Sequence, residues 1–193
     1  MEILRVLPAH AHHRAAELYW EAFGRKLGPA LGPAERGVAF LAAHLHPDRA
    51  VAAMAGDRLV AVAGYRHGGR ALLGGGPLDV LRAYGPVRGL PRVALLALLE
   101  RHAAPGELVM DGIAVDPALR GQGIGSLLLD EVAAVARDLG HDRIRLDVID
   151  ANPRARALYE RHGFVAGRTE ATPYLRRLLG FGAVTTMRRK VGR

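Results

Sequence analysis

The sequence predicts a mixed α/β fold, with some α+β character, in a single domain over residues 1–193. One observation is the order strand, helix, strand, helix, strand in the second half of the chain, which is typical of this class. Another is a hairpin pattern at residues 50–67, where two short apolar runs flank a turn. The chain is also 193 residues long and 50% apolar, which is enough for one substantial core.

The first half of the chain is expected to contain a strand, two helices and the hairpin. In chain order these elements lie at residues 3–7, 11–23, 33–46, 50–55 and 59–67. The stretch "GRKLGPALGP" between the two helices combines glycine with proline, so we expect a loop there. Gly56 and Asp57 separate the two hairpin strands and supply the turn.

Residues 68–91 are rich in Gly and Pro, and we interpret them as a surface insertion with one short helix at 77–83. The segment also carries Leu and Tyr, so a wall of a binding site is the alternative. A helix is expected to follow at residues 91–102.

The second half has clearer signals. Residues 107–115 and 143–149 read as strands, and an amphipathic helix at 124–139 lies between them. Asn152 as N-cap and Pro153 at the first helical position predict a short helix at 152–162. Two further strands are expected, one beginning at residues 164–167 and the last at 183–189.

The net charge of +8 favours partners that carry phosphate, such as nucleic acid, an anionic membrane or a phosphorylated cofactor. The basic residues are spread along the chain, aromatic residues make up only 5%, and no basic-aromatic stripe occurs. Nucleic-acid binding is therefore disfavoured, although it is the main alternative to an enzyme.

The chain contains no cysteine, which excludes disulfides, thiolate metal sites and a cysteine nucleophile. No apolar run has the roughly 18 residues that a membrane span needs, and the N-terminus lacks the pattern of a secretory signal. These observations favour a cytoplasmic protein that is not membrane-bound. The histidines at positions 10, 12 and 13 lack the spacing of a metal site, so no metal is expected.

The stretch "VDPALRGQGIGS" at residues 115–126 joins a strand to a helix. Glycines at 121, 123 and 125 let the backbone turn tightly, and the helix start offers unpaired N–H groups that bind phosphate. Arg120 adds a charge suited to phosphate. The loop lacks the lysine of a nucleotide P-loop, and its G-x-G-x-G spacing differs from the G-x-G-x-x-G of dinucleotide sites. Coenzyme A is the third phosphate-bearing candidate.

The motif "RGQGIG" at residues 120–125 resembles the Q/R-x-x-G-x-G/A pyrophosphate loop of the GNAT superfamily of N-acetyltransferases. The segment "NPRARALYERHGF" at residues 152–164 is similar to the N-x-x-A-x-x-L-Y-x-x-x-G-F helix of the same superfamily. The close resemblance spans about residues 108–167, and the first hundred residues fit the family order only loosely. The residues in register in the second motif are Asn152, Ala155, Leu158, Tyr159, Gly163 and Phe164.

This resemblance implies a central mixed, largely antiparallel sheet of six to seven strands flanked by helices, with the fourth and fifth strands splayed apart. It also implies transfer of an acetyl group from acetyl-CoA, as co-substrate, to an amine. The pyrophosphate would lie on the loop and the pantetheine arm along the fourth strand. The implied cofactor-binding residues are Ile113, Ala114, Val115, Arg120, Gly121, Gln122, Gly123, Ile124, Gly125, Ser126, Asn152 and Arg156.

Two residues are implied to be catalytic. Tyr159 would donate a proton to the leaving thiolate, and Asp111 would remove a proton from the amine. By period-two counting, Asp111 lies on the same face as Ile113 and Val115, where burial would raise its pKa. Family members often carry a Glu at this place, so the shorter Asp makes a bridging water plausible; Glu107 is the second candidate.

Because there is no cysteine, direct attack within a ternary complex is favoured over an acyl-enzyme route. The sequence leaves open the acceptor amine, which ranges from a small amine to a peptide or protein amine. It also leaves open a homodimer, and a CoA-binding sensor without transfer activity.

Overall fold

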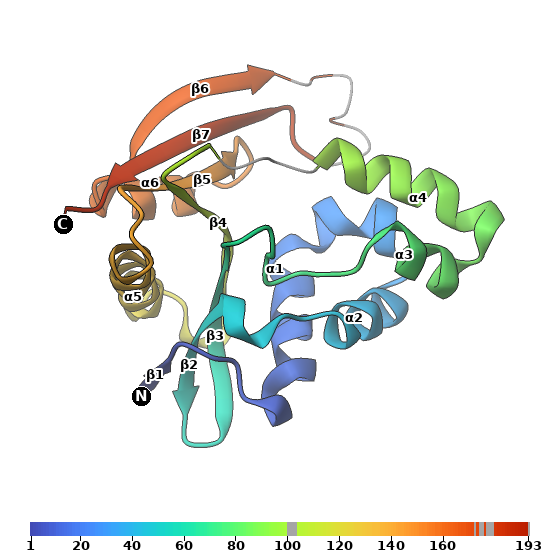
Figure 1. Cartoon of the computed structure of the whole chain (residues 1–193), viewed down its shortest axis with the longest axis horizontal. Helices are drawn as coiled ribbons and strands as arrows, with labels where there is room; N and C mark the ends of the chain where they lie inside the picture. Colours follow the sequence, from blue (N-terminus) through green and yellow to red (C-terminus); the bar gives the residue numbers. More distant parts are fainter. Residues whose placement is uncertain (100–103, 172, 174–175, 177–179, 193) are drawn as a thin grey trace.

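The computed structural model describes residues 1–99, 104–171, 173, 176 and 180–192. Its centre is a seven-stranded sheet in the order β1-β2-β3-β4-β5-β7-β6 (Figure 1). Neighbouring strands are antiparallel except β4 and β5, which are parallel. The strands are β1 (Glu2–Leu4), β2 (Ala50–Ala55), β3 (Arg58–Arg66), β4 (Glu107–Val115), β5 (Arg143–Ile149), β6 (Val165–Ala171) and β7 (Ala183–Lys190).

The predicted fold class, including the splay, is therefore confirmed. Beyond the three residue pairs from Glu107↔Arg143 to Val109↔Arg145, β4 and β5 no longer pair within the described residues. The hairpin of β2 and β3 forms as predicted, and Gly56 at its turn has a φ of +59°. The first strand is shorter than expected, because the chain leaves the sheet after Leu4 and Leu7 instead donates its N–H to the Pro47 carbonyl.

Helices α1 (His12–Leu31), α2 (Ala34–Ala43), α3 (Pro77–Tyr84) and α4 (Pro86–Leu99) lie on one side of the sheet (Figure 1). The loop expected at "GRKLGPALGP" is wrong, because α1 continues through Pro29 to Leu31. Ala30 and Leu31 are buried in the core beneath these helices, so packing outweighs the low helix propensity of Gly and Pro.

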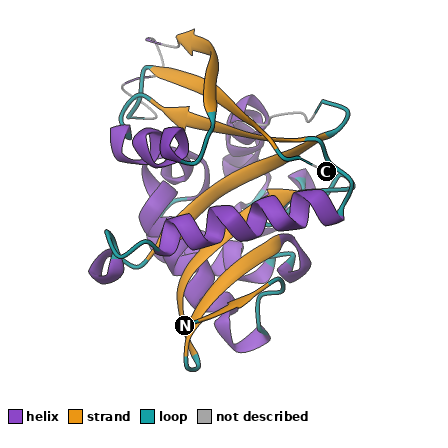
Figure 2. Cartoon of the chain, turned by 90° about the vertical axis from the view of Figure 1, so that its left-hand side faces the viewer, coloured by secondary structure: helices purple, strands orange, loops and turns teal. Residues whose placement is uncertain are grey.

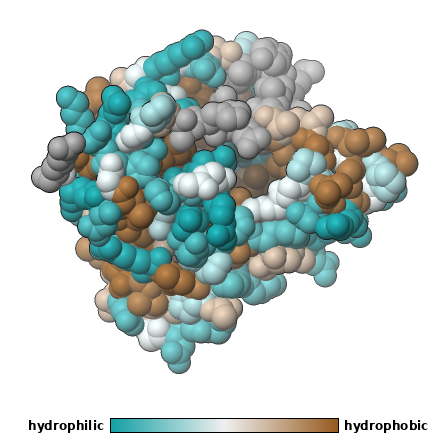
Figure 3. Space-filling view, in the orientation of Figure 1, coloured by the Kyte–Doolittle hydropathy of each residue, from teal (hydrophilic) through white to brown (hydrophobic). Residues whose placement is uncertain are grey.

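Residues 68–91 form more structure than a surface insertion. The helix α3 is present as predicted, and α4 starts at Pro86, five residues before the expected start. The end expected at residue 102 lies outside the described residues. Leu78, Val87 and Leu90 are exposed, and hydrophobic residues gather over α3 and α4 on the right of Figure 3.

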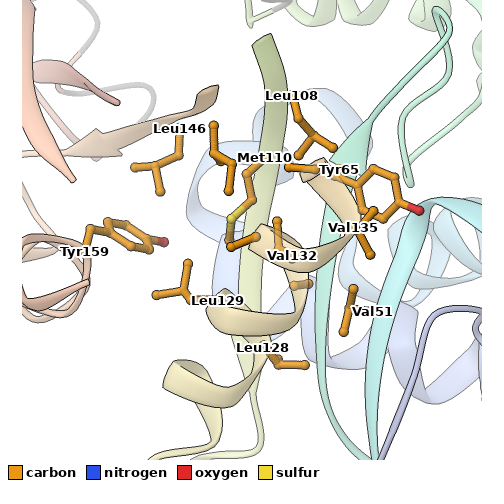
Figure 4. Close-up of a cluster of buried hydrophobic side chains, with 14 of the residues drawn as sticks. Val51, Tyr65, Leu108, Met110, Leu128, Leu129, Val132, Val135, Leu146 and Tyr159 are labelled. Carbon is orange, nitrogen blue, oxygen red and sulfur yellow. The ribbon is translucent and has the colours of Figure 1, made fainter. Parts of the chain in front are cut away.

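Helices α5 (Ile124–Asp138) and α6 (Pro153–Arg161) lie on the opposite side of the sheet, and α5 crosses its face (Figure 2). The apolar face predicted for α5 packs on β4 and its neighbours: Leu128, Leu129 and Val132 are fully buried there. Figure 4 shows Met110 of β4 and Leu146 of β5 beside them, with Tyr159 of α6 at the edge of the cluster. This core fixes the start of α5 relative to the ends of β4 and β5.

Candidate active site

The loop between β4 and α5 takes the backbone conformation that its glycines allow. Gly121 and Gly123 have φ values of +82° and +83°, and Gly123 is the N-cap of α5. A Cβ placed on either glycine would meet nothing within 4 Å. Residues 120–123 are exposed. The glycines are therefore required by the turn, and the outer face of the loop is open to a ligand.

The same loop presents a row of backbone donors. Ser126 and Leu127 donate their N–H groups to the Gly123 carbonyl. Among the described residues, the N–H groups of Gly121, Gln122 and Gly123 donate to no backbone carbonyl. The first N–H groups of a helix also lack intrahelical acceptors, and the helix dipole is positive at this end. The arrangement is that of an anion site.

Asp116 anchors the start of this loop and was not singled out by sequence reasoning. Its buried carboxylate accepts a hydrogen bond from the Ala118 N–H at 3.1 Å and forms ion pairs with Arg14 at 2.9 Å and Arg58 at 2.5 Å. The Ala118 hydrogen bond, together with the two arginines, lowers the pKa of Asp116. The signal in the sequence is an Asp-Pro step directly after a strand, which favours a turn.

The open edge of β4 lies next to this loop. Residues Ile113 to Val115 pair with β3 on one side, but they lie beyond the last β4–β5 pair on the other side. Apart from the Val115 carbonyl, which accepts from Arg120, their backbone groups on that side are therefore available to an extended ligand that carries amides. Arg120 folds back onto this strand end, since its Nε donates to the Val115 carbonyl at 3.0 Å and its Nη2 lies 3.5 Å from Glu21.

A bulge in β4 changes the face on which Asp111 lies. Gly64 pairs with Gly112 and Tyr65 pairs with Met110, so Asp111 is the extra residue of β4. Period-two counting therefore fails here. Ile113 and Val115 pack against the α5 core, whereas Asp111 lines a pocket on the α1 side. The expectation that Asp111 shares a face with these two residues is wrong.

Burial raises the pKa of Asp111, although Arg66, the Leu72 N–H and Lys26 act in the opposite direction. The Leu72 N–H donates to its Oδ2 at 3.2 Å. The pocket that it lines has a volume of about 390 Å³ and is mainly apolar. Residues 71–77 form part of its wall, so the alternative interpretation of the 68–91 segment, a wall of a binding site, fits the structure better than a surface insertion.

Tyr19 is a pocket residue that sequence reasoning missed. It is buried on α1, and its hydroxyl donates to the Gly112 carbonyl at 3.3 Å, directly beside the bulge. Burial raises its pKa well above the ordinary value. A Cβ on Gly64 would lie 2.4 Å from this hydroxyl, so only glycine at position 64 admits it. In the sequence Tyr19 looks like any other apolar position of an amphipathic helix.

Tyr159 lies on α6, on the other side of β4. Its ring packs against Phe164 with centroids 5.8 Å apart, and its hydroxyl points toward β4 (Figure 4). Burial raises the pKa of Tyr159 to about 12. The N-cap predicted at Asn152 is present, because its Oδ1 accepts the Ala155 N–H at 3.1 Å.

Three other predicted residues have protein partners. Ser126 is hydrogen-bonded to His162 at 2.9 Å, which ties the start of α5 to the end of α6. Arg156 pairs with Glu160 one turn later on the exposed side of α6. Glu107 accepts from Arg188 at 2.9 Å and does not line the pocket with Asp111.

Among the described residues, no group of three or more His, Asp or Glu side chains is placed to hold a metal ion. No helix of the described chain is long and apolar enough to cross a membrane.

Comparisons with known proteins agree with this geometry. A solved N-acetyltransferase from Staphylococcus aureus Mu50 has a similar fold, with a TM-score of 0.69 at 14% identity, over 97% of this chain and 100% of that one. A mycothiol acetyltransferase from Beutenbergia cavernae is 48% identical over 62 residues, which are 32% of this chain and 20% of the relative. A thialysine N-epsilon-acetyltransferase from Bos taurus is 46% identical over 56 residues, 29% of this chain and 33% of that one.

These curated relatives are therefore matched over a third of their own length or less. The match to the family as a whole is much longer. The model of the "Acetyltransferase (GNAT) family" matches residues 12–164, which include α1, the bulged strand β4, the glycine loop and the Tyr159 helix. The resemblance found in two short motifs thus extends over most of the chain, which belongs to the acetyltransferase (GNAT) family.

Proposed function

We propose that this protein transfers the acetyl group of acetyl-CoA to a primary amine by direct attack within a ternary complex. One observation carries the proposal. The anion-binding loop and Tyr159 reach β4 from the α5 side, and the pocket with Asp111 reaches it from the α1 side. Asp111 and the residues of β4 that lead into the loop lie beyond Val109, where β4 no longer pairs with β5 within the described residues. A donor and an acceptor can therefore approach each other through the open sheet.

The donor would be held by backbone groups. The pyrophosphate would accept hydrogen bonds from the N–H groups of residues 122–125, at the positive end of α5, since the Ser126 N–H is already bonded to the Gly123 carbonyl. The pantetheine amides would pair with the open edge of β4 at residues 113–115. A backbone N–H near Val115 would polarise the thioester carbonyl. Arg120, Asn152 and Arg156 are proposed to add contacts at the rim.

Asp111 is the proposed general base. An amine arrives protonated and has to lose a proton before it can attack. A buried carboxylate with a raised pKa accepts a proton more readily than an exposed one does. Asp111 lies in the pocket wall where the amine would enter, directly or through one water. Glu107, the other candidate, is paired with Arg188 away from this pocket, which favours Asp111.

Tyr159 is the proposed general acid. The amine nitrogen attacks the thioester carbonyl carbon, the C–S bond breaks, and the thiolate of CoA takes a proton from Tyr159. The nitrogen releases its remaining extra proton to solvent, and solvent returns a proton to the phenol. A phenol with a pKa of about 12 remains protonated at neutral pH and can donate to that sulfur. Because the sequence has no cysteine, no acyl-cysteine intermediate can form, which favours direct passage of the acetyl group to the amine.

The test combines binding and turnover. Acetyl-CoA should raise the melting temperature of the protein, and a library of amines should include one that releases the CoA thiol, with the acetylated product seen by mass spectrometry. No shift in melting temperature at millimolar acetyl-CoA would refute the proposal. A shift without thiol release from any amine would instead indicate a CoA-binding sensor. Salt-sensitive binding to random DNA without a shift would indicate a nucleic-acid-binding protein.

A further inference from the structure

The pocket beside Asp111 has the size of a site for one small molecule. Its volume of about 390 Å³ lies near the lower end of the range for small-molecule sites, about 300–1,000 Å³. Its wall comes from α1, α2, residues 71–76, α3 and α4, with Arg66 of β3 and Asp111 of β4. The apolar side chains of its wall include Phe23, Leu27, Phe40, Leu73, Val80 and Leu96.

Within the described part of the chain, three charged side chains also line this pocket: Lys26 from α1, Arg66 from the end of β3, and Asp111. Among the described residues, the pocket thus presents two cationic donors beside one carboxylate within an otherwise apolar wall. Both cations are close enough to Asp111 to act on its carboxylate. An ammonium group has three donors and a guanidinium has five, so each can bind ligand oxygens in addition to a protein partner.

We propose that the acceptor is a small primary amine that also carries a carboxylate and an apolar body, with Lys26 and Arg66 binding the carboxylate and the amine lying next to Asp111. This proposal rests on the proposed function and names the substrate class of the same site. The apolar body fills the space between α1, α2 and α4. An apolar amino acid has this chemistry.

The same charges disfavour other amines. A polyamine would bring a second ammonium group next to Lys26 and Arg66, and like charges placed together cost binding energy. An amine without a carboxylate brings no anionic group for Lys26 and Arg66 to bind. A lysine side chain within a protein has no carboxylate close to its amine. The pocket therefore discriminates by charge as well as by size.

The experiment measures thiol release from acetyl-CoA with matched pairs of amines. The probes are L-leucine, L-phenylalanine and 6-aminohexanoate, each compared with its own carboxamide, together with spermidine and a lysine-containing peptide. Amidation removes the charge and nearly preserves the shape. In the two α-amino acids it also lowers the basicity of the amine, which makes attack easier. A preference for the acid therefore reports the carboxylate contact.

We expect at least one acid to exceed its amide by tenfold or more in kcat/KM, and both spermidine and the peptide to be poor substrates. Lys26→Gln and Arg66→Gln should each reduce that preference several-fold. The control is Arg25→Gln, which removes a charge from the neighbouring position of α1 outside the pocket wall and should leave the preference unchanged. Acids and amides within twofold of each other, or a peptide or polyamine used better than every acid, would overturn the proposal.

If acetyl-CoA binds but no amine releases thiol, the proposed function fails and the inference is decided by binding. The melting temperature of the CoA-saturated protein is then measured with each acid and its amide. A larger shift with an acid, lost in Lys26→Gln and kept in Arg25→Gln, supports an anion-binding acceptor pocket. Equal shifts, or no shift with any probe, reject it.

Discussion

Replacement of Gly123 by alanine separates the role of the loop in folding from its role in binding. Gly123 has a φ of +83° and is the N-cap of α5, at the point where the free N–H groups converge. No protein atom lies within 4 Å of the position that the new Cβ would take. The methyl group therefore clashes with nothing in the protein, and only the backbone conformation and a bound ligand can be affected.

The cost in stability follows from the backbone. An alanine in the left-handed region costs roughly 1–2 kcal/mol, and the reduced freedom of the unfolded chain returns about 0.4–1 kcal/mol. We expect a net loss of about 1 kcal/mol in the free energy of unfolding. The cost in binding is larger, since a hydrogen bond to a charged group contributes about 1.5–3 kcal/mol. Loss of one such bond to the pyrophosphate would raise the Kd for CoA roughly ten- to a hundredfold.

The chain offers a matched control at Gly56, in the turn between β2 and β3. Its φ is +59°, and a Cβ there would also meet nothing within 4 Å. Gly56→Ala should therefore lose about as much stability as Gly123→Ala, by the same mechanism, while its Kd for CoA stays at the wild-type value. Denaturant titration gives the free energies of unfolding, and calorimetric titration with CoA gives the affinities. If Gly123→Ala binds CoA as tightly as Gly56→Ala does, the loop is not the pyrophosphate site.

Three further predictions concern the two sides of β4. Tyr159→Phe should lower kcat by about a hundredfold, the lower end for a lost general acid, and change the Kd for CoA less than twofold; unchanged turnover would remove Tyr159 from the mechanism. Asp111→Asn should abolish most activity and yet raise stability near neutral pH by about 1 kcal/mol. The pKa of Asp111 is higher in the folded protein than in the unfolded chain. The wild type therefore loses stability as the pH rises from the ordinary carboxyl range through that raised value, whereas the variant has no carboxyl group at this position to ionise. The free energies of unfolding of the two proteins, measured by denaturant titration at acidic and at neutral pH, should thus become similar in acid. The same difference in free energy at both pH values would contradict this reasoning. Gly112→Ala places a Cβ 2.4 Å from Cζ of Phe23, so overpacking should cost about 1–3 kcal/mol in denaturant titrations, and a neutral effect would show that α1 can move aside.

The local structure on the proposed donor side of the site was predictable because its signals are local. The turn at residues 120–125 follows from glycines that take left-handed backbone conformations, and the helix after it follows from a periodic apolar face. Asn152 caps α6 as its residue type predicts. In each case the interacting groups lie within a few positions of one another. The exact bounds of β4 and β5 were predicted for the same reason.

The proposed acceptor side was not predictable, because its parts are far apart in the chain. The pocket combines α1 and α2 with residues 71–77, α4 and the middle of β4. The extension of α1 through Pro29 depends on burial of Ala30 and Leu31, which no local pattern reports. Period-two counting also assumed a regular strand, and the extra residue at Asp111 reversed the faces beyond it.

A pair of glycines explains why the bulge and the pocket occur together. Gly64 and Gly112 lie opposite each other on β3 and β4. The space that their missing side chains leave is filled by Tyr19 and Phe23 of α1, whose rings have centroids 5.2 Å apart. The helix therefore approaches the sheet closely at this point, and the Tyr19 hydroxyl holds the Gly112 carbonyl. A side chain at either glycine would push α1 away from β4, and Asp111 would lose the burial that raises its pKa. The proposed base and the pocket wall thus depend on the same two small residues.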